Sequence, residues 1–196
     1  MCIRDSRYST RFGTVIASPD LKSERATHYE LGYSGALSPQ WNLDAALFVA
    51  NIEDSIQQVT VPAQLNCAAP CGQYQNIAKA RNQGFELGLK GDLGDWELGA
   101  SYTFLDRENR SNPELHPIDT PRHNLFASAT WNHDAWRLTG SAEAASKRYN
   151  VSDGSQMSGG YAVYNFKSGY RFSNDVLVEA GVRNLFDRLY EYSEGY

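Results

Sequence analysis

The sequence lacks a long apolar run, a run of basic residues and any basic patch that would suit nucleic acid. The mean hydropathy is -0.52, and no segment approaches the roughly 18 apolar residues that a membrane-spanning helix needs. The 18 Lys and Arg residues are scattered and the formal net charge is -5, which argues against nucleic acid as a partner. Membrane β-strands are not excluded, because each needs only about 9–11 residues, half of them polar.

Motifs that carry catalysis are also missing. The chain has no Gly-rich phosphate loop and no Ser or Cys nucleophile motif. We interpret the acids of the polar stretch 106–120 as a solvated connection. The four histidines lie in separate segments and indicate no common site: His28, His116, His123 and His133. We therefore expect no enzymatic activity, no cofactor, and no catalytic or metal site.

Alternation of apolar and polar residues is what the sequence has in abundance. In the stretch 84–90, Phe85, Leu87 and Leu89 alternate with Gly, Glu and Lys; the Gly- and Asp-rich segment 91–95 follows, and then 96–104 alternates again. A period of two predicts a strand with one apolar and one polar face. Two such strands around a Gly- and Asp-rich turn predict an antiparallel hairpin.

The rest of the chain repeats this design after an irregular segment, 7–25. Alternating segments begin near Ala26, Trp41, Arg122, Trp136, Tyr164 and Val176, and together with the hairpin they make eight predicted strands. Short connections at 36–40, 91–95, 132–135 and 173–175 alternate with long ones at 60–74, 106–120 and 150–160. The pattern predicts an all-β fold, an antiparallel up-and-down meander of about eight strands with its short turns at one end.

All four tryptophans flank the short turns: Trp41, Trp96, Trp131 and Trp136. The fourth short turn has Tyr170 and Phe172 beside it instead. We predict an aromatic girdle at a membrane interface, as in transmembrane barrels. A soluble β-sandwich also alternates apolar and polar residues, but it would rarely place every Trp at one end, so the membrane barrel is favoured.

The opposite face of the predicted strands carries charges of both signs, and we expect it to line the barrel interior. Its charged and titratable members are His28, Glu30, Glu86, Lys90, Glu97, Arg137, Glu143, Lys167, Arg171, Glu179 and Arg183.

Four short motifs resemble those of TonB-dependent outer-membrane receptors. Residues 21–32 resemble their LKPE…E-G segment, with Ser23 where Pro is usual, and 76–86 resemble their N-x-x-x-A-x-x-x-G-x-E strand. Residues 121–124 resemble their P-x-H strand start. The last motif, NLFD…Y…GY, is matched by Asn184, Leu185, Phe186 and Asp187, followed by Tyr190, Gly195 and Tyr196.

The resemblance implies a 22-stranded barrel that is plugged by an N-terminal domain. On this basis we expect 26–196 to be an incomplete segment of the transmembrane barrel, about strands 14–21, and 7–25 to be an extracellular loop segment. The plug domain and the last strand would be absent. Residues 1–6 (MCIRDS) fit nothing downstream, and we interpret them as a non-native scar.

The resemblance also implies a function. It predicts part of a receptor in the bacterial outer membrane for energy-coupled uptake of a scarce nutrient, first a ferric siderophore and then cobalamin, haem or another metal complex. The implied partners are outer-membrane lipid, the receptor's own plug, the TonB protein acting through the N-terminal part, and the small metal complex. No ligand-contacting residue is identified by the motifs.

Cys67 and Cys71 lie in a predicted outside connection. Two cysteines in an oxidising compartment predict a disulfide that closes a small loop. A zinc site would need two further ligands, and no nearby His supplies them.

Two functions of other classes remain open at this point. A complete eight-stranded barrel could be a structural or adhesion protein of the outer membrane, although the polar tail 191–196 does not suit a closing strand. A soluble carbohydrate-binding sandwich is the other.

Overall fold

The computed structural model describes residues 15–62, 67, 71–173 and 175–191. Its strands are β1 (Val15–Ile16), β2 (Arg25–Ser38), β3 (Trp41–Val61), β4 (Cys71–Leu93), β5 (Trp96–Asn109), β6 (His123–His133), β7 (Trp136–Ala145), β8 (Arg148–Tyr149), β9 (Met157–Ser158), β10 (Tyr161–Arg171) and β11 (Leu177–Val182). In these residues we find no helix that is long and apolar enough to cross a membrane. The predicted all-β class is confirmed.

The eight long strands follow the chain order in the sheet, as a meander does. Hydrogen-bonded neighbours run β11-β10-β7-β6-β5-β4-β3-β2, and the short β1 pairs with β4 in parallel. The strands β2 and β11 end this order, and in the described part of the chain they do not pair with each other. The alternative of a small barrel closed by these eight strands is therefore wrong.

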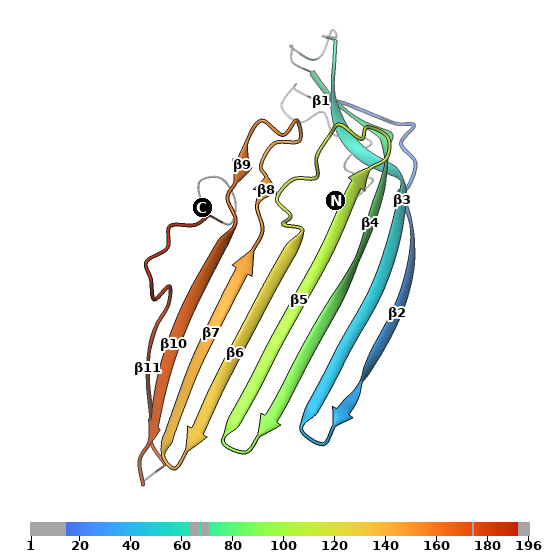
Figure 1. The fold of residues 1–196 in the computed structure, drawn as a ribbon. Coiled ribbons are helices and arrows are strands. Elements are labelled where there is room, and N and C mark those ends of the chain that lie inside the picture. Colours follow the sequence, from blue (N-terminus) through green and yellow to red (C-terminus); the bar gives the residue numbers. More distant parts are fainter. Residues whose placement is uncertain (1–14, 63–66, 68–70, 174, 192–196) are drawn as a thin grey trace. The chain divides into compact units, whose positions relative to one another are not determined.

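The chain forms two compact units, which we describe separately. The first contains 15–29, 49–82 and 107–115, and the second contains 30–48, 83–106 and 116–191. In the second unit the strands lie side by side with their short turns at one end (Figure 1). Backbone hydrogen bonds link neighbouring turns: Asp92 N–H donates to Gln40 O at 2.9 Å, Asn132 to Asp95 at 2.7 Å, and Arg171 to Ala135 at 2.8 Å.

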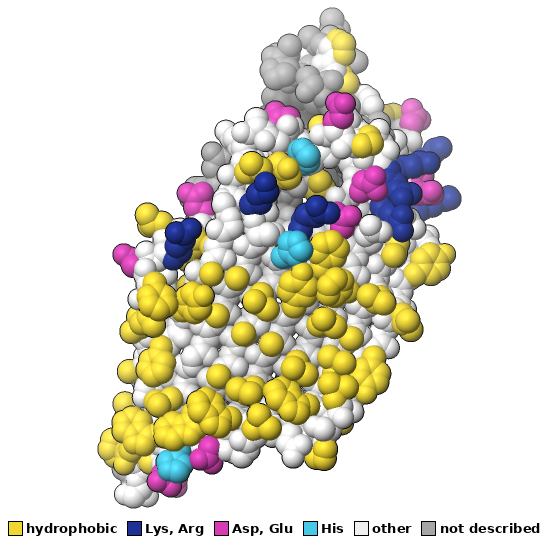
Figure 2. Space-filling model, in the orientation of Figure 1, with side chains coloured by type: hydrophobic (Ala, Val, Ile, Leu, Met, Phe, Trp, Pro, Cys, Tyr) yellow, Lys and Arg dark blue, Asp and Glu magenta, His cyan; other side chains and the backbone are white. Residues whose placement is uncertain are grey.

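The registers of the second unit keep like residues on the same face. Leu98 lies opposite Ala129, Ala127 opposite Ala142, and Ala142 opposite Tyr164. Because side chains alternate between faces along each strand, these pairs make one continuous apolar surface. Figure 2 shows the hydrophobic side chains spread over this surface.

The turn chemistry explains why these hairpins close where the sequence predicts. Gly94 has φ 65°, Asp134 has φ 50° and Asp175 has φ 61°. A tight hairpin turn needs left-handed backbone of this kind, which Gly adopts freely and Asp or Asn tolerate. The predicted strand starts at Trp96 and Trp136 are confirmed.

The strands extend beyond the predicted limits at the end opposite the short turns. In the first unit β3 reaches Val61 and β4 begins at Cys71, inside the connection predicted for 60–74. In the second unit the connection predicted for 150–160 contains β9, which pairs with β8. The strands β8 and β9 have two residues each, which is too short for a period of two to be seen in the sequence.

Candidate membrane-facing surface and motif sites

Aromatic rings pair across strands on the apolar surface of the second unit. The Phe85 ring centroid lies 5.6 Å from that of Tyr102 and 5.6 Å from that of Phe104. Toward the other edge of the same sheet, the rings of Tyr164 and Phe186 lie edge to face with their centroids 5.4 Å apart. Tilted and edge-to-face rings at these separations attract each other beyond the area that they cover.

Large rings gather at the turn end of this surface. Trp96 lies opposite Trp131 with 6.5 Å between ring centroids, and Trp136 lies opposite Tyr170 with 4.8 Å between them. Trp41 covers the backbone of Gly91, where a Cβ atom would lie only 2.5 Å from the Trp41 ring. All four Trp residues thus lie beside short turns at one end of the second unit, and the girdle at a membrane interface remains a prediction.

Cross-strand polar pairs cover the opposite face of the second unit. Arg137 lies 3.1 Å from Glu97, and Lys167 lies 2.6 Å from Glu179. The hydroxyl of Tyr161 donates to Glu143 Oε1 at 2.8 Å. Arg137 of β7 reaches across β6 to Glu97 of β5, whereas Lys167 and Glu179 lie on the adjacent strands β10 and β11. Both ion pairs are about half exposed, so each stabilises the sheet only modestly.

In the first unit, two of the family-like motifs meet around a bulge of β3. Asn76 Oδ1 accepts from Lys22 N–H at 2.7 Å, while its Nδ2 donates to the carbonyls of Lys22 at 2.9 Å and Asp54 at 2.7 Å. Glu24 Oε1 accepts from Ile56 N–H at 2.7 Å. Asp54 has φ 56°, the conformation expected of a bulge. The motif residues therefore hold backbone together here.

Gly84 of the second unit has a comparable structural role. A Cβ atom at this position would lie 2.0 Å from the Phe104 carbonyl oxygen and 3.0 Å from the Phe48 ring. The backbones of β4 and β5 approach too closely for any side chain. The Gly of the N-x-x-x-A-x-x-x-G-x-E motif is thus required by packing.

The P-x-H motif begins β6 beside the aromatic pairs. Arg122 forms an ion pair with Asp106, and its guanidinium carbon lies 5.9 Å from the centroid of the Phe104 ring. His123 Nδ1 is 2.7 Å from the Tyr102 hydroxyl. Both motif side chains contact aromatic residues at the border of the apolar surface, opposite the turn end.

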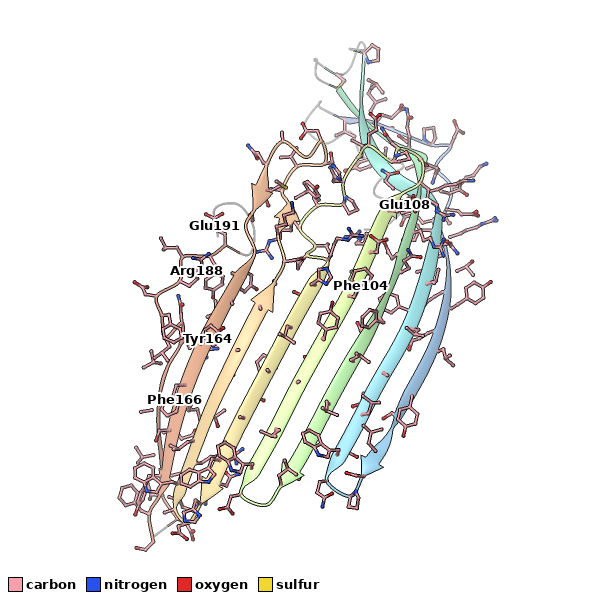
Figure 3. The ribbon with its side chains drawn as sticks, in the orientation of Figure 1. Phe104, Glu108, Tyr164, Phe166, Arg188 and Glu191 are labelled. Atoms are coloured by element: carbon pink, nitrogen blue, oxygen red, sulfur yellow. The ribbon has the colours of Figure 1, made fainter. Side chains whose placement is uncertain are left out.

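The NLFD motif folds the tail of the second unit back onto β10. The Asn184 amide donates to Arg188 O at 2.9 Å and accepts from Arg188 N–H at 2.8 Å, and its own N–H donates to Asn165 Oδ1 at 3.0 Å. Leu185 N–H donates to Tyr164 O at 2.7 Å. Figure 3 shows Arg188 and Glu191 on this segment beside β10, which carries Tyr164 and Phe166. Asn184 has φ 52°, which an Asn tolerates.

Sequence reasoning missed the residue that holds the far end of this tail. Arg148 is 5% exposed, donates to the Glu191 carbonyl, and lies with its guanidinium carbon 5.8 Å from the centroid of the Tyr161 ring. Tyr190 packs on Tyr161 with ring centroids 4.7 Å apart. Nothing around Arg148 in the sequence marks it, since its partners Ser158, Tyr161 and Glu191 are ten or more positions away.

The three histidines of the second unit, His116, His123 and His133, have different neighbours. His116 stacks on Tyr149 at 4.0 Å, and His133 Nδ1 is 2.9 Å from Asp95 Oδ2. In the connection 150–160, hydrogen bonds from Ser155 lower the pKa of Asp153 below its usual value. Within the described residues, no group of three His, Cys, Asp or Glu side chains is arranged to hold a metal ion.

Cys67 is buried and disulfide-bonded in the first unit. The side chain of Cys71 and the whole of Cys2 lie outside the described part of the chain. The pairing of Cys67 with Cys71 therefore remains a prediction. The interpretation of 1–6 as a scar and the final Gly195–Tyr196 of the tail motif also lie outside the described residues.

A two-faced antiparallel meander of this kind defines the wall of a transmembrane β-barrel. The family described as "TonB dependent receptor-like, beta-barrel" matches residues 5–185. The chain belongs to this family, and it is part of an outer-membrane β-barrel. The resemblance carried by the four motifs is confirmed.

Similar proteins include an iron-regulated outer-membrane protein, a vitamin B12 transporter and a ferric-catecholate import receptor. The chain is 26% identical to the iron-regulated outer membrane virulence protein of Vibrio cholerae serotype O1, covering 94% of this chain and 30% of that protein. It is 23% identical to the vitamin B12 transporter BtuB of Photobacterium profundum, covering 91% and 29%. The ferric-catecholate import receptor Fiu of K12 E. coli superposes with a TM-score of 0.70 at 25% identity, covering 89% of this chain and 25% of that one. The chain thus spans less than a third of the length of these relatives.

Proposed function

We propose that this chain is part of a receptor that imports a ferric siderophore across the outer membrane with energy supplied through the TonB protein. The observation that carries the siderophore assignment is the similarity to a ferric-catecholate import receptor over 89% of the chain. The similarity to an iron-regulated outer-membrane protein also supports the siderophore assignment. Cobalamin is the second candidate, supported by the vitamin B12 transporter, and haem or another metal complex is the third.

The described surfaces support a role as barrel wall in this receptor. The apolar face of the second unit suits lipid, and the face with Glu97–Arg137 and Lys167–Glu179 suits a wetted interior that contacts a plug. We propose that 26–196 is a section of a larger barrel, about strands 14–21 of 22, and that the four tryptophans form its girdle at the periplasmic interface. The segment 7–25 then belongs to an extracellular loop.

Uptake in a strain deleted for the gene tests the ligand. We expect the deletion strain to lose accumulation of radioactive iron from ferric catecholate siderophores under iron limitation, and to regain it with the intact gene on a plasmid. Accumulation of labelled cobalamin should be unchanged. Loss of cobalamin uptake with normal iron uptake would replace the siderophore proposal with the cobalamin one.

The loop crosslink has its own test. Protein taken from the outer membrane should contain a peptide in which Cys67 and Cys71 are joined, because the outside compartment is oxidising. Mass spectrometry after alkylation without reductant reports this directly. Alkylated thiols at both positions would remove the crosslink from the proposal.

A further inference from the structure

A cavity lies in the first unit where two segments of the chain separate. The short β1 pairs with β4 up to Ile16 and Gln73. Further along, the side chain of Asn76 binds the backbone of Lys22 through both its oxygen and its nitrogen. Between these two contacts the first segment has five residues and β4 has only two, so the longer segment has to leave the strand.

A proline turn takes up the extra residues. The Leu21 N–H donates to the Ser18 carbonyl at 3.2 Å, and Pro19 occupies the second position of this four-residue turn. Proline is favoured there because its ring presets the backbone angle that the turn needs. A cavity of about 250 Å³ lies between 18–21 and 73–76. Pockets for drug-sized ligands measure roughly 300–1,000 Å³, so this one suits a ligand of a single small ring.

Polar groups that can bind a ligand line this cavity. Ser18 is 7% exposed, and its Oγ atom is buried with no hydrogen-bond partner among the described residues. A buried hydroxyl without a partner destabilises a fold, and rotation about its Cα–Cβ bond can turn it toward a ligand. Gln75 Nε2 donates to Gln73 Oε1 at 2.8 Å, which places both amides on one side of β4. This bond leaves the nitrogen of Gln73 and the oxygen of Gln75 for another partner.

The charge of the lining argues against an anionic ligand. Asp20 is the one acid among the eight described residues that line the cavity, and none of the eight is a Lys or an Arg. A carboxylate at the rim repels catecholates and phosphates. The amides and the hydroxyl both donate and accept hydrogen bonds, and Tyr74 adds an aromatic residue. Together they match a neutral ring that has several hydroxyl groups and an apolar C–H face.

We propose that this cavity binds a single neutral sugar ring. The hydroxyl groups of the sugar bond to Ser18, Gln73 and Gln75, and its apolar face packs on Tyr74. The site is separate from any that takes an anionic iron complex, because Asp20 supplies the only full charge of the described lining. The proposal therefore does not depend on which nutrient the receptor imports.

Saturation-transfer NMR on the purified chain tests this site, in micelles of lauryldimethylamine oxide, a detergent that contains no sugar. The probes are D-glucose, D-galactose and D-mannose, and at least one should show saturable binding. Ser18→Ala should raise its dissociation constant about fivefold, because one hydrogen bond is lost. The matched control Ser23→Ala removes an exposed hydroxyl of the same unit that does not line the cavity, and it should bind as the original chain does.

Stability and charge supply two further readings. Without sugar, Ser18→Ala should unfold at the same urea concentration as the original chain or a higher one, since the hydroxyl that it removes has no partner. If that variant fails to fold, Gln75→Leu removes an amide of the lining at similar size and should weaken binding about as much. The uronic acid of the bound sugar should bind at least about twofold more weakly than the sugar, and Asp20→Asn should remove that difference. The proposal is overturned by no saturable binding of any of the three sugars, by unchanged binding in the folded cavity variant, by an equal loss in Ser23→Ala, or by tighter binding of the uronic acid.

Discussion

The two faces of the sheet in the second unit are built from the same strands and yet have opposite chemistry. One face leaves large apolar side chains in the open, with Leu31 73% and Leu47 59% exposed. The other carries ion pairs and hydrogen bonds between strands, such as Glu97–Arg137 across β6 and Tyr161–Glu143 between the neighbours β10 and β7. A soluble sandwich would cover its apolar face with a second layer. The apolar face here instead has the character of a surface solvated by lipid.

The difference between the faces is most severely tested at neighbouring positions of β4. Leu87→Arg should lower the free energy of unfolding by about 2–4 kcal/mol where the residue lies near the bilayer midplane, because a guanidinium is placed in hydrocarbon. Urea titration in lipid, followed by Trp fluorescence, measures this. The control Glu86→Gln changes the polar face and should be nearly neutral. Equal losses at the two positions would mean that the faces are not distinguished by lipid.

At Gly84 on the polar face, the space between strands rather than charge decides which residue fits. Gly84→Ala should destabilise the protein by ~1–3 kcal/mol, since the new methyl group would meet the Phe104 carbonyl and force β4 and β5 apart. The matched control is Gly140→Ala, where nothing lies within 4 Å of the added Cβ. Its urea midpoint should stay the same or rise slightly. A Gly84→Ala protein as stable as the control would show that the strands separate at little cost.

The sequence predicted these two faces well, because the amphipathic period is a local signal. Leu98 and Ala129 each alternate with polar neighbours in the sequence, and the two lie opposite each other on adjacent strands. The turns at Gly94 and Asp134 were also predictable from residue type. No comparable signal existed for β9, whose residues Met157 and Ser158 show no alternation.

The roles of the motif residues could not be worked out from the sequence alone. Asn76 holds the backbone of Lys22, 54 positions away, and Gly84 makes room for the carbonyl of Phe104. Such roles depend on the strand register, which the motifs do not encode. The motif match pointed to the family, and the contacts show how Asn76 and Gly84 join or accommodate backbone segments within the chain.

A smaller effect is expected in the tail after β11. There the side chain of Asn184 holds the backbone through hydrogen bonds to Arg188, in place of strand pairing. Asn184→Ala should cost about 1–2 kcal/mol, because it removes two hydrogen bonds to Arg188 and because Ala, unlike Asn, rarely adopts a φ of 52°. Asn184→Gly is the control, since Gly accepts that backbone conformation and loses only the hydrogen bonds. Amide exchange at 185–188 should rise in both variants, and more in the Ala variant. Unchanged exchange would mean that the side chain of Asn184 does not hold this segment.

The smallest effect is expected from the ion pairs of the polar face. Lys167 Nζ lies 2.6 Å from Glu179 Oε1, but their side chains are 51% and 38% exposed, so water and salt screen the attraction. A double-mutant cycle with Lys167→Gln and Glu179→Gln should give a coupling of ~0–1 kcal/mol that falls as salt is added. Both positions lie on adjacent strands, Lys167 opposite Gly181 and Glu179 opposite Gly169, so the pair crosses the ladder diagonally. A coupling well above this range that resists salt would mean that the pair is shielded from water, as it would be where a plug covers this wall. The cycle therefore distinguishes an interior wall that is open to water from one that is covered.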